Sequence, residues 1–214
     1  MLNIMRGTVF ILLLGSLGAA CADPVRDLVV AAQLDSAGSV KKLLASGLSP
    51  NTIDPISGEP VVQVALREDA NQVVDVLVAA SDFDPERMAP NGNTALMLAA
   101  YKRNKRAVLA LLAKGAIVTR PGWTALHYAA ASGDTEITAV LLDKHAYIDA
   151  ESPSKLTPLM IAAREGHQPV VELLLREGAD ARLRNNEQLT AKQIAERAEK
   201  PRIVKAIDAW MASK

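Results

Sequence analysis

Apolar residues recur along this chain in a pattern that predicts pairs of short helices. Six segments carry apolar residues at i, i+3 and i+4, the spacing that places them on one face of a helix. The segments are VKKLLASGL (40–48), VVDVLVAAS (73–81), VLALLAKGA (108–116), ITAVLLDKH (137–145), VVELLLREG (170–178) and IVKAIDAWM (203–211). A second apolar phrase lies before most of them, so each unit is expected to hold two helices.

The phrase before these segments is nearly the same each time. It reads NGNTALMLAAYKRN (91–104), PGWTALHYAAASGD (121–134) and SKLTPLMIAAREGH (154–167). Its threonines, Thr94, Thr124, Thr157 and Thr190, recur at steps of 30, 33 and 33 residues, and Pro60 takes the same place one step earlier. A period in this range indicates a repeat architecture in which each unit buries its apolar side against its neighbours.

Local signals support the same helix boundaries. Asn104 and Asp134 lie between the two helices of their units, where short polar side chains cap a following helix. Gly115 and Gly178 follow second helices, as C-terminal caps do. Pro158 falls in the first turn of its helix, where a missing N–H costs little.

These residues carry a family resemblance. The phrase TALHYAA (124–130), followed by Gly133-Asp134, and the phrase TPL (157–159), followed by Gly178-Ala179-Asp180, resemble the ankyrin repeat. The resemblance implies an all-α fold, an ankyrin-repeat solenoid of about six helix-turn-helix units with short β-hairpin loops and a concave face. The expected domain is 23–214, with units at approximately 24–54, 55–88, 89–118, 119–151, 152–184 and 185–214.

Several units depart from the pattern. The first lacks the threonine phrase, and the last has Lys192 and Gln193 where inner units have apolar residues or histidine, so both are interpreted as polar end caps and a monomer is expected. Three residues are missing between the third and fourth units, which predicts a shortened loop at 116–122. Asp69 and Arg103 replace the glycine at the turn between helices, which makes the local geometry harder to predict.

Residues 1–22 have the layout of a secretory signal peptide. One positive charge, Arg6, precedes the apolar run TVFILLL (8–14), and small residues follow at 15–22. This run is too short to span a bilayer. Cleavage after Ala22 would leave a soluble chain starting at Asp23, whereas LGAAC (17–21) resembles a lipobox and would make Cys21 a lipidated N-terminus. The first alternative predicts a periplasmic protein, and the second an envelope lipoprotein.

Composition narrows the range of partners. After Arg6 is removed the chain has 23 Lys and Arg against 24 Asp and Glu, which gives no electrostatic reason to expect nucleic acid or an anionic membrane. The absence of an N-x-[ST] sequon favours a bacterial periplasm over a eukaryotic secretory route. The run YKRNKR (101–106) is basic with one aromatic, a weak nucleic-acid signal, and is better interpreted as a solvated edge or a patch for an acidic protein.

No pattern points to catalysis, a metal or a cofactor. His127, His145 and His167 lack the i, i+4 spacing of a helical zinc site, and Cys21 is the only cysteine. No nucleophile elbow or phosphate-binding glycine loop is present. The family resemblance implies that His127 braces successive loops by hydrogen bonds. A non-enzymatic protein without cofactors is therefore expected.

Binding to another protein suits the architecture better. In the ankyrin family, variable residues at loop tips and first-helix ends contact other proteins. Mapped onto this chain, those positions predict a partner-binding set: Arg67, Glu68, Asn91, Asn93, Tyr101, Lys102, Trp123, Lys155, Arg164 and Glu165. Tyr101 and Trp123 are the strongest candidates because large aromatics dominate interface energetics, although Trp123 could instead cover the shortened loop.

Overall fold

The computed structural model describes residues 23–213. This part of the chain holds twelve helices in six pairs, and each pair lies inside one of the unit ranges expected from the sequence. The first helices of the pairs are α1 (Pro24–Gln33), α3 (Val61–Arg67), α5 (Ala95–Tyr101), α7 (Ala125–Ser132), α9 (Pro158–Glu165) and α11 (Ala191–Arg197). The second helices are α2 (Ala37–Ala45), α4 (Asn71–Ala79), α6 (Lys105–Ala113), α8 (Thr135–Asp143), α10 (Gln168–Arg176) and α12 (Pro201–Ala212).

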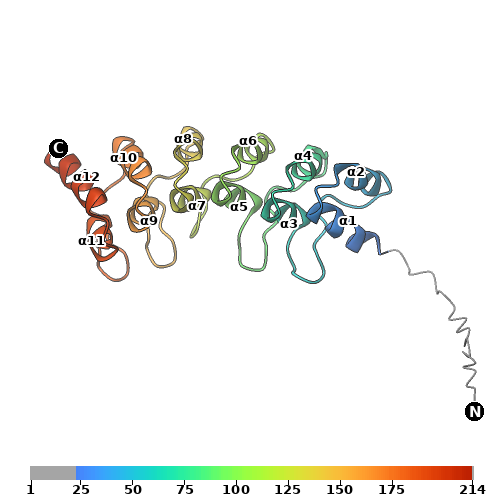
Figure 1. Ribbon diagram of the computed structural model, residues 1–214, viewed down its shortest axis with the longest axis horizontal. Helices are drawn as coiled ribbons and strands as arrows, with labels where there is room; N and C mark the ends of the chain where they lie inside the picture. The colour runs from blue at the N-terminus through green and yellow to red at the C-terminus, as the bar shows by residue number, and fades with distance from the viewer. Residues whose placement is uncertain (1–22, 214) are drawn as a thin grey trace, which may run out of the picture.

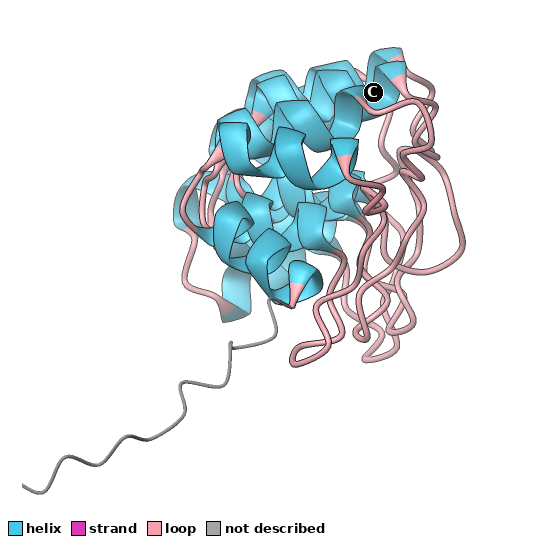
Figure 2. Ribbon diagram, turned by 90° about the vertical axis from the view of Figure 1, so that its right-hand side faces the viewer, coloured by secondary structure: helices cyan, strands magenta, loops and turns pink. Residues whose placement is uncertain are grey.

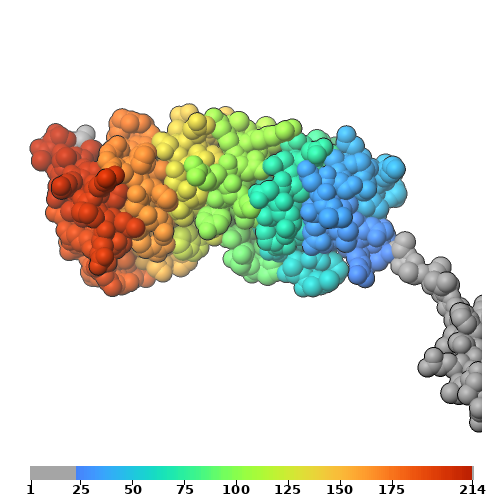
Figure 3. Space-filling model, in the orientation of Figure 1, coloured from blue at the N-terminus to red at the C-terminus, as the bar shows by residue number. Residues whose placement is uncertain are grey.

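The pairs stack side by side in chain order. Figure 1 shows the first helices in one row and the second helices in another, with the loops between units projecting from the row of first helices. The loops gather on one side of the helices in Figure 2, and the space-filling view shows one elongated body (Figure 3). Each first helix contacts the first helix of the next unit, from α1–α3 to α9–α11. The expected all-α solenoid is confirmed.

Small side chains let neighbouring first helices approach closely. Both members of the pairs Ala99-Ala100, Ala129-Ala130 and Ala162-Ala163 are fully buried. Larger apolar residues such as Leu126 and Leu141, also fully buried, fill the space between the two helix rows. The buried side chains form two hydrophobic clusters, one from the first to the fourth unit and one from the fourth to the sixth, and Leu142 packs against both. Burial between successive units is how an array of short helices obtains stability.

The predicted caps are present at helix N-termini. The Asn104 side chain accepts a hydrogen bond from the Ala107 N–H at 3.0 Å at the start of α6, and Asp134 accepts one from the Ile137 N–H at 2.8 Å at the start of α8. The turn between helices takes a left-handed conformation whether or not it holds glycine: φ is 75° at Gly133, 56° at Asp69 and 58° at Arg103. The register of the stack therefore imposes this turn even on residues that adopt it at a cost of about 1–2 kcal/mol.

The loops between units are closed by a recurring backbone hydrogen bond. It joins Ala89 N to Asn93 O at 2.9 Å in the third unit and Ser152 N to Leu156 O at 3.0 Å in the fifth. No strand forms in residues 23–213, which contain one isolated antiparallel bridge, Ile53 to Pro60. The expected hairpins are thus tight turns with little strand character.

The shortened loop at 116–122 is held in a different way. Glu86 accepts a hydrogen bond from the Ile117 N–H at 2.8 Å and pairs with the Arg120 guanidinium at 3.2 Å. A hydrogen bond and an ion pair to Glu86, in the segment between α4 and α5, thus stabilise the loop.

The two ends of the stack differ in polarity. At the C-terminal end, Lys192 pairs with Asp208 at 2.7 Å on a solvated surface. At the N-terminal end, Val30 is 42% and Leu34 73% exposed, so α1 presents a less polar surface than an end cap was expected to have. The monomeric state stays a prediction. Within the described residues, no helix has the length and apolar character needed to cross a membrane.

Candidate functional site

The tips of the loops and the C-terminal ends of the first helices form one surface, which we call the inner-helix face. Equivalent positions line up along it because every unit repeats the same geometry. Seven residues after Pro60 or the recurring threonine, the first-helix ends supply Arg67, Tyr101, Ala131, Arg164 and Arg197. These equivalent positions therefore hold arginine toward both ends of the inner-helix face and tyrosine near its middle.

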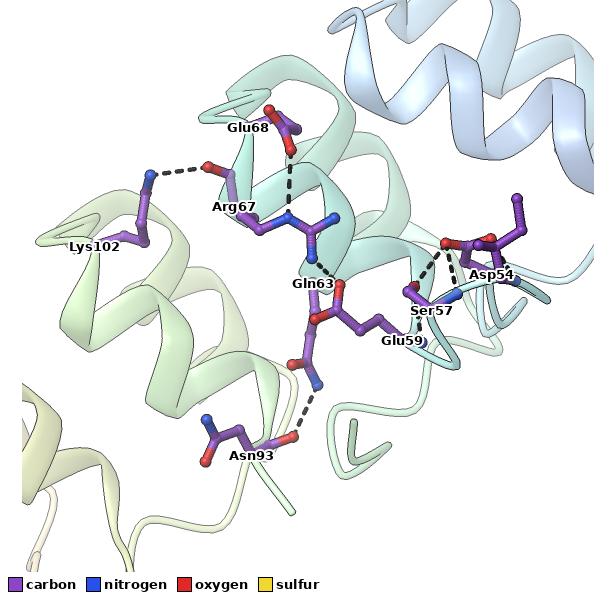
Figure 4. A network of polar contacts seen from close by, with 9 residues as sticks. Asp54, Ser57, Glu59, Gln63, Arg67, Glu68, Asn93 and Lys102 are labelled. Carbon is purple, nitrogen blue, oxygen red and sulfur yellow. Dashed lines mark hydrogen bonds and ion pairs between the residues drawn. The ribbon is translucent and has the colours of Figure 1, made fainter. Parts of the chain in front are cut away.

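The N-terminal part of the face is a network of paired charges (Figure 4). Arg67 forms ion pairs with Glu59 of its own loop and with Glu68, the latter at 3.3 Å. From the next unit, Lys102 Nζ donates to the Arg67 carbonyl oxygen and to the Asp69 carboxylate, both at 2.9 Å. Three predicted site residues, Arg67, Glu68 and Lys102, are thus brought together, and each cation already has an acidic partner.

The loop tip of the second unit is also held by a carboxylate. Asp54 accepts hydrogen bonds from the Ser57 hydroxyl at 2.6 Å and from the Ile56 and Ser57 N–H groups at 3.1 and 3.2 Å. The Ser57 hydroxyl bond, more than the backbone bonds, lowers the pKa of Asp54 below its usual value. Near neutral pH the ionised carboxylate fixes this tip.

Three aromatic side chains gather at the middle of the face, and we call them the aromatic cluster: Tyr101, Trp123 and Tyr128. The Tyr128 ring lies between the other two, 6.2 Å from Tyr101 in an edge-on arrangement and 6.1 Å from Trp123 at a tilt of 55°. Tyr101 is 54% exposed and Trp123 38% exposed. The two predicted anchors therefore belong to one exposed patch, although Trp123 also packs edge-on against the His127 ring at 5.3 Å.

Asn93 supports this cluster. Its Oδ1 atom accepts a hydrogen bond from the Tyr128 hydroxyl at 2.7 Å, and its carbonyl oxygen accepts one from Gln63 Nε2 at 2.9 Å. Its neighbour Asn91 is exposed and accepts a hydrogen bond from the Asn93 N–H at 3.0 Å. Asn93 thus has its side chain engaged within the protein, while Asn91 faces solvent at the loop tip.

His127 braces two units beneath Trp123. Its Nε2 atom lies 2.9 Å from the Leu156 carbonyl oxygen of the next loop, and the Thr124 N–H donates to Nδ1 at 3.2 Å. These contacts assign the neutral tautomer with hydrogen on Nε2. Burial lowers the pKa of His127, partly opposed by the carbonyl groups of Leu156 and Ala150. The side chain therefore acts in the structure as a neutral bridge.

The remaining predicted residues lie in the fifth unit. Lys155 is exposed at the loop tip with φ of 55°, and Arg164 pairs with Glu165 at 2.9 Å at the end of α9. Beside them a groove of about 450 Å³ separates the fifth and sixth units. It is lined by Ser154, Leu156, Arg164, Asn185, Asn186, Glu187, Leu189, Ile194, Arg197 and Ala198. The inner-helix face thus continues to the last unit.

The face combines exposed aromatic rings with paired charges. Within residues 23–213, no three His, Cys, Asp or Glu side chains are grouped so that they could hold a metal ion. The predicted cleavage site after Ala22 and the alternative lipid attachment at Cys21 lie outside the described residues. Exposed aromatic rings among paired charges can bury apolar area and form hydrogen bonds with a ligand.

Sequence reasoning missed Tyr128, the residue that joins Tyr101 to Trp123. Comparing equivalent positions of the units would have singled out Tyr128. The residue four after Pro60 or the threonine is aliphatic in the other units and aromatic here: Val64, Leu98, Tyr128, Ile161 and Ile194. A tyrosine at a position that is aliphatic in the other units indicates that this unit presents a different side-chain surface, with a ring and a hydroxyl group.

Comparisons with known proteins agree with this architecture. The family model described as ankyrin repeats (3 copies) matches residues 28–121, 63–152, 117–185 and 146–207. The crystal structure of the ankyrin repeat domain of Bcl-3, titled a unique member of the IkappaB protein family, superposes with a TM-score of 0.71 and 26% identity. That match covers 85% of this chain and 81% of the other.

The curated relatives are much longer proteins. The human transient receptor potential cation channel subfamily A member 1 is 32% identical over 152 residues, which is 66% of this chain and 14% of that protein. The human SH3 and multiple ankyrin repeat domains protein 2 is 35% identical over 163 residues, 72% of this chain and 9% of that protein. The mouse protein fem-1 homolog A-like is 38% identical over 104 residues, 47% of this chain and 16% of that protein. The chain therefore spans less than a fifth of the length of these relatives.

Proposed function

Because this chain belongs to the ankyrin-repeat family, we propose that it is a non-catalytic module that binds another protein through its inner-helix face. Ankyrin repeats are protein-interaction modules. The proposed role is that of an adaptor, or of an accessory or inhibitory partner of another protein, acting in the bacterial periplasm.

The aromatic cluster is the observation that carries this proposal. Tyr101 and Trp123 expose large rings on the face formed by loop tips and first-helix ends. Solvent-exposed tyrosine and tryptophan that pack together are typical of interface anchors, where truncation often costs about 2 kcal/mol or more. The remaining predicted residues, including Arg67, Lys155 and Arg164, would form the polar rim around this centre.

The periplasmic location is supported by the leader at 1–22. Its apolar run and small-residue end resemble a signal peptide, and cleavage after Ala22 would release a chain without cysteine. Such a chain needs no disulfide in an oxidising compartment, because its stability comes from the stacked core.

Capture from a periplasmic extract tests the binding surface. The exported chain is compared with a Tyr101→Ala variant and with a matched control, Tyr147→Ala. Tyr147 is 58% exposed in the connection after α8, and among the described residues its ring makes no aromatic contact with the cluster. A protein retained by the wild type and by Tyr147→Ala, but lost with Tyr101→Ala at unchanged melting temperature, supports the proposal. Equal retention by all three would remove the inner-helix face from consideration.

The alternative is a scaffold tethered to the envelope through Cys21. The resemblance of LGAAC (17–21) to a lipobox supports this alternative. Mass spectrometry of the mature N-terminus separates the two: a free Asp23 means a soluble protein, and a diacylglyceryl group on Cys21 means a tethered one. Either result leaves the protein-binding face unchanged.

A further inference from the structure

The groove of about 450 Å³ between the fifth and sixth units, which we call the terminal groove, has the chemistry of a site for one class of ligand. Taking the proposed binding role of the inner-helix face as its premise, we propose that the terminal groove binds a short segment of the partner in which an acidic side chain adjoins an apolar one. Arg164, Arg197 and Asn185 hold the carboxylate. Leu156 and Leu189 contact the apolar side chain.

Asn185 presents an N–H donor to the terminal groove. It lines the groove and is 6% exposed. Its Oδ1 atom accepts hydrogen bonds from the Glu187 and Leu189 N–H groups, both at 3.0 Å, which fixes the orientation of the amide. Among residues 23–213, Nδ2 makes no hydrogen bond to a protein group, and the one completely enclosed side-chain atom without a partner is Arg120 Nη1. Asn185 Nδ2 is therefore an accessible donor that a ligand can engage.

The amide of Asn185 is not needed to close its loop. Asp54 closes the loop of the second unit in the same way, with its backbone N–H donating to the Glu59 carbonyl oxygen at 2.8 Å and a carboxylate oxygen accepting from the N–H two residues later. Asn185 N donates to the Leu189 carbonyl oxygen at 3.1 Å, and its Oδ1 likewise accepts from the N–H two residues later. The Nδ2 group is thus left for another role.

Two guanidinium groups border the groove from successive first helices. Arg164, at the end of α9, uses Nε for Glu165 at 2.9 Å, and Arg197, at the end of α11, uses Nη1 for Glu187 at 2.6 Å. Within the described part of the chain, the two other nitrogens of each guanidinium have no acceptor. An arginine side chain can hold a further carboxylate through such nitrogens.

The charges of the lining favour a ligand with a single negative charge. Arg164 and Arg197 stand against Glu187, which leaves one net positive charge in the terminal groove. One carboxylate balances that charge, whereas a phosphate dianion would exceed it and repel Glu187. A cation would meet an excess of positive charge. The side chain of aspartate or glutamate therefore fits best.

Apolar side chains lie beside these donors. Leu156 and Leu189 line the groove, are half-buried and pack against the core of the last two units, and Ile194 lines it at 7% exposure. An apolar residue next to the acidic one would cover the exposed part of both leucines. The volume of the groove is near the lower end for small-ligand sites, which suits one or two side chains.

The groove is also preformed. The Asn186 N–H donates to the Ser154 carbonyl oxygen at 3.1 Å, and Asn186 Nδ2 donates to the Pro153 carbonyl oxygen at 3.4 Å. These bonds tie the loop before α11 to the loop before α9. Little conformational entropy is therefore lost when a segment binds between them.

Nuclear magnetic resonance with a blocked tripeptide tests the proposal. Acetyl-Leu-Glu-Leu-amide carries one carboxylate between two apolar side chains and has no charged terminus. It is titrated into the exported, isotope-labelled chain, and the backbone amide signal of Leu189 at the groove is followed. We expect a saturable shift at millimolar peptide. Acetyl-Leu-Gln-Leu-amide, which has the same shape without the charge, should bind about tenfold more weakly.

A pair of arginine variants tests the role of the guanidinium groups. Arg164→Gln is expected to weaken binding of the acidic tripeptide about tenfold. Arg176→Gln is the matched control, because Arg176 pairs through Nε with Glu177 at 3.5 Å, as Arg164 does with Glu165, but does not line the terminal groove. It should leave binding unchanged.

A pair of asparagine variants tests the donor. Asn185→Asp keeps an acceptor for the loop, as Asp54 shows, but places a second carboxylate in the groove, and we expect it to abolish saturable binding. Asn71→Asp adds the same charge at the start of α4, where Asn71 Oδ1 accepts from Asn104 Nδ2, and should leave binding unchanged. Melting temperatures check that all four variants remain folded.

Three results would overturn the proposal: no saturable shift of the Leu189 signal with the acidic tripeptide, equal binding of the glutamine peptide, or equal weakening by Arg164→Gln and Arg176→Gln. Tighter binding of acetyl-Leu-Leu with a free terminal carboxylate, or of inorganic phosphate, would also overturn it by assigning the groove to another anion.

These failures are distinct from failure of the binding role itself. If a periplasmic protein is captured in a Tyr101-dependent manner while the acidic tripeptide does not bind, the inner-helix face binds a protein but the terminal groove does not hold an acidic segment. If the tripeptide binds as expected while capture is unaffected by Tyr101→Ala, the aromatic cluster loses its proposed role and the terminal groove keeps its own.

Discussion

The bridge made by His127 leads to a sharp prediction about stability and pH. His127→Ala removes the hydrogen-bond partners of the Leu156 carbonyl oxygen and of the Thr124 N–H, and leaves a cavity at a side chain that is 1% exposed. A buried polar group that loses its partner costs about 1–3 kcal/mol, and the cavity adds to this. We expect the free energy of unfolding to fall by about 2–4 kcal/mol.

Glutamine at this position is the matched control. Gln63, at the equivalent position of the second unit, donates from Nε2 to the Asn93 carbonyl oxygen at 2.9 Å, the same inter-unit bridge that His127 makes to Leu156. In the last unit, Gln193 Oε1 accepts from the Thr190 N–H at 3.0 Å. One amide can therefore replace both bonds of the imidazole, and we expect His127→Gln to cost less than half as much as His127→Ala.

The pH dependence has a definite sign. Because burial lowers the pKa of His127 in the folded chain, the unfolded chain binds a proton first as pH falls. The stabilising contribution is complete above the unfolded pKa of about 6.5 and is lost as pH falls below it toward the lowered folded pKa. His127→Gln should remove the contribution of His127 to the pH dependence of the free energy of unfolding.

Urea denaturation followed by circular dichroism at pH 8 and pH 5 provides the measurement. The wild type should lose more stability between these two pH values than His127→Gln does, and His127→Ala should be the least stable of the three at pH 8. An identical pH dependence in wild type and His127→Gln would show that the buried imidazole is not the titrating group. Equal stability of the alanine and glutamine variants would refute the bridge.

Two further predictions concern the core and the turns. Leu141→Ala, at a fully buried position of α8, should lower the free energy of unfolding by about 3 kcal/mol in the same urea experiment. Leu109→Ala, where the side chain is 45% exposed, should lower it by less than about 1 kcal/mol. Similar losses at both sites would contradict the burial of Leu141. Gly133→Ala should be more harmful than Gly178→Ala, because a Cβ at Gly133 would lie 2.5 Å from the His167 ring while Gly178 has open space around it. Both sites have positive φ, so the difference between their melting temperatures isolates the clash, and no difference would show that the His167 ring moves aside freely.

The repeated phrase was enough to predict the fold. The recurrence of Thr94, Thr124, Thr157 and Thr190 defines units whose apolar faces can be buried only against each other. A helix cap depends on a few adjacent residues and can therefore be predicted locally. The structure confirms the predicted cap at Asn104. The left-handed turn at Asp69 and Arg103 was harder to foresee, because the stack rather than the residue type imposes it.

The candidate site was predictable as a list of positions, but not as an arrangement. Tyr101 and Trp123 could be selected because unit geometry places them at a first-helix end and a loop tip. Tyr128 was missed because its role depends on contacts with the preceding unit, to Tyr101 and to Asn93 across 35 positions of sequence. Likewise, nothing in the spacing of Arg67 and Lys102 shows that both are already paired with carboxylates.

The amino-acid sequence by itself determined the helices, their pairing and the order of the stack, because these follow from apolar periodicity and turn chemistry within about 33 residues. The tertiary structure alone decided which side chains meet between units: Gln63 with Asn93, Lys102 with Arg67, and three aromatic rings in one exposed cluster. The physical reason is that these contacts depend on the offset between successive units, which is set by close packing of the whole core and is felt only when all layers are in place.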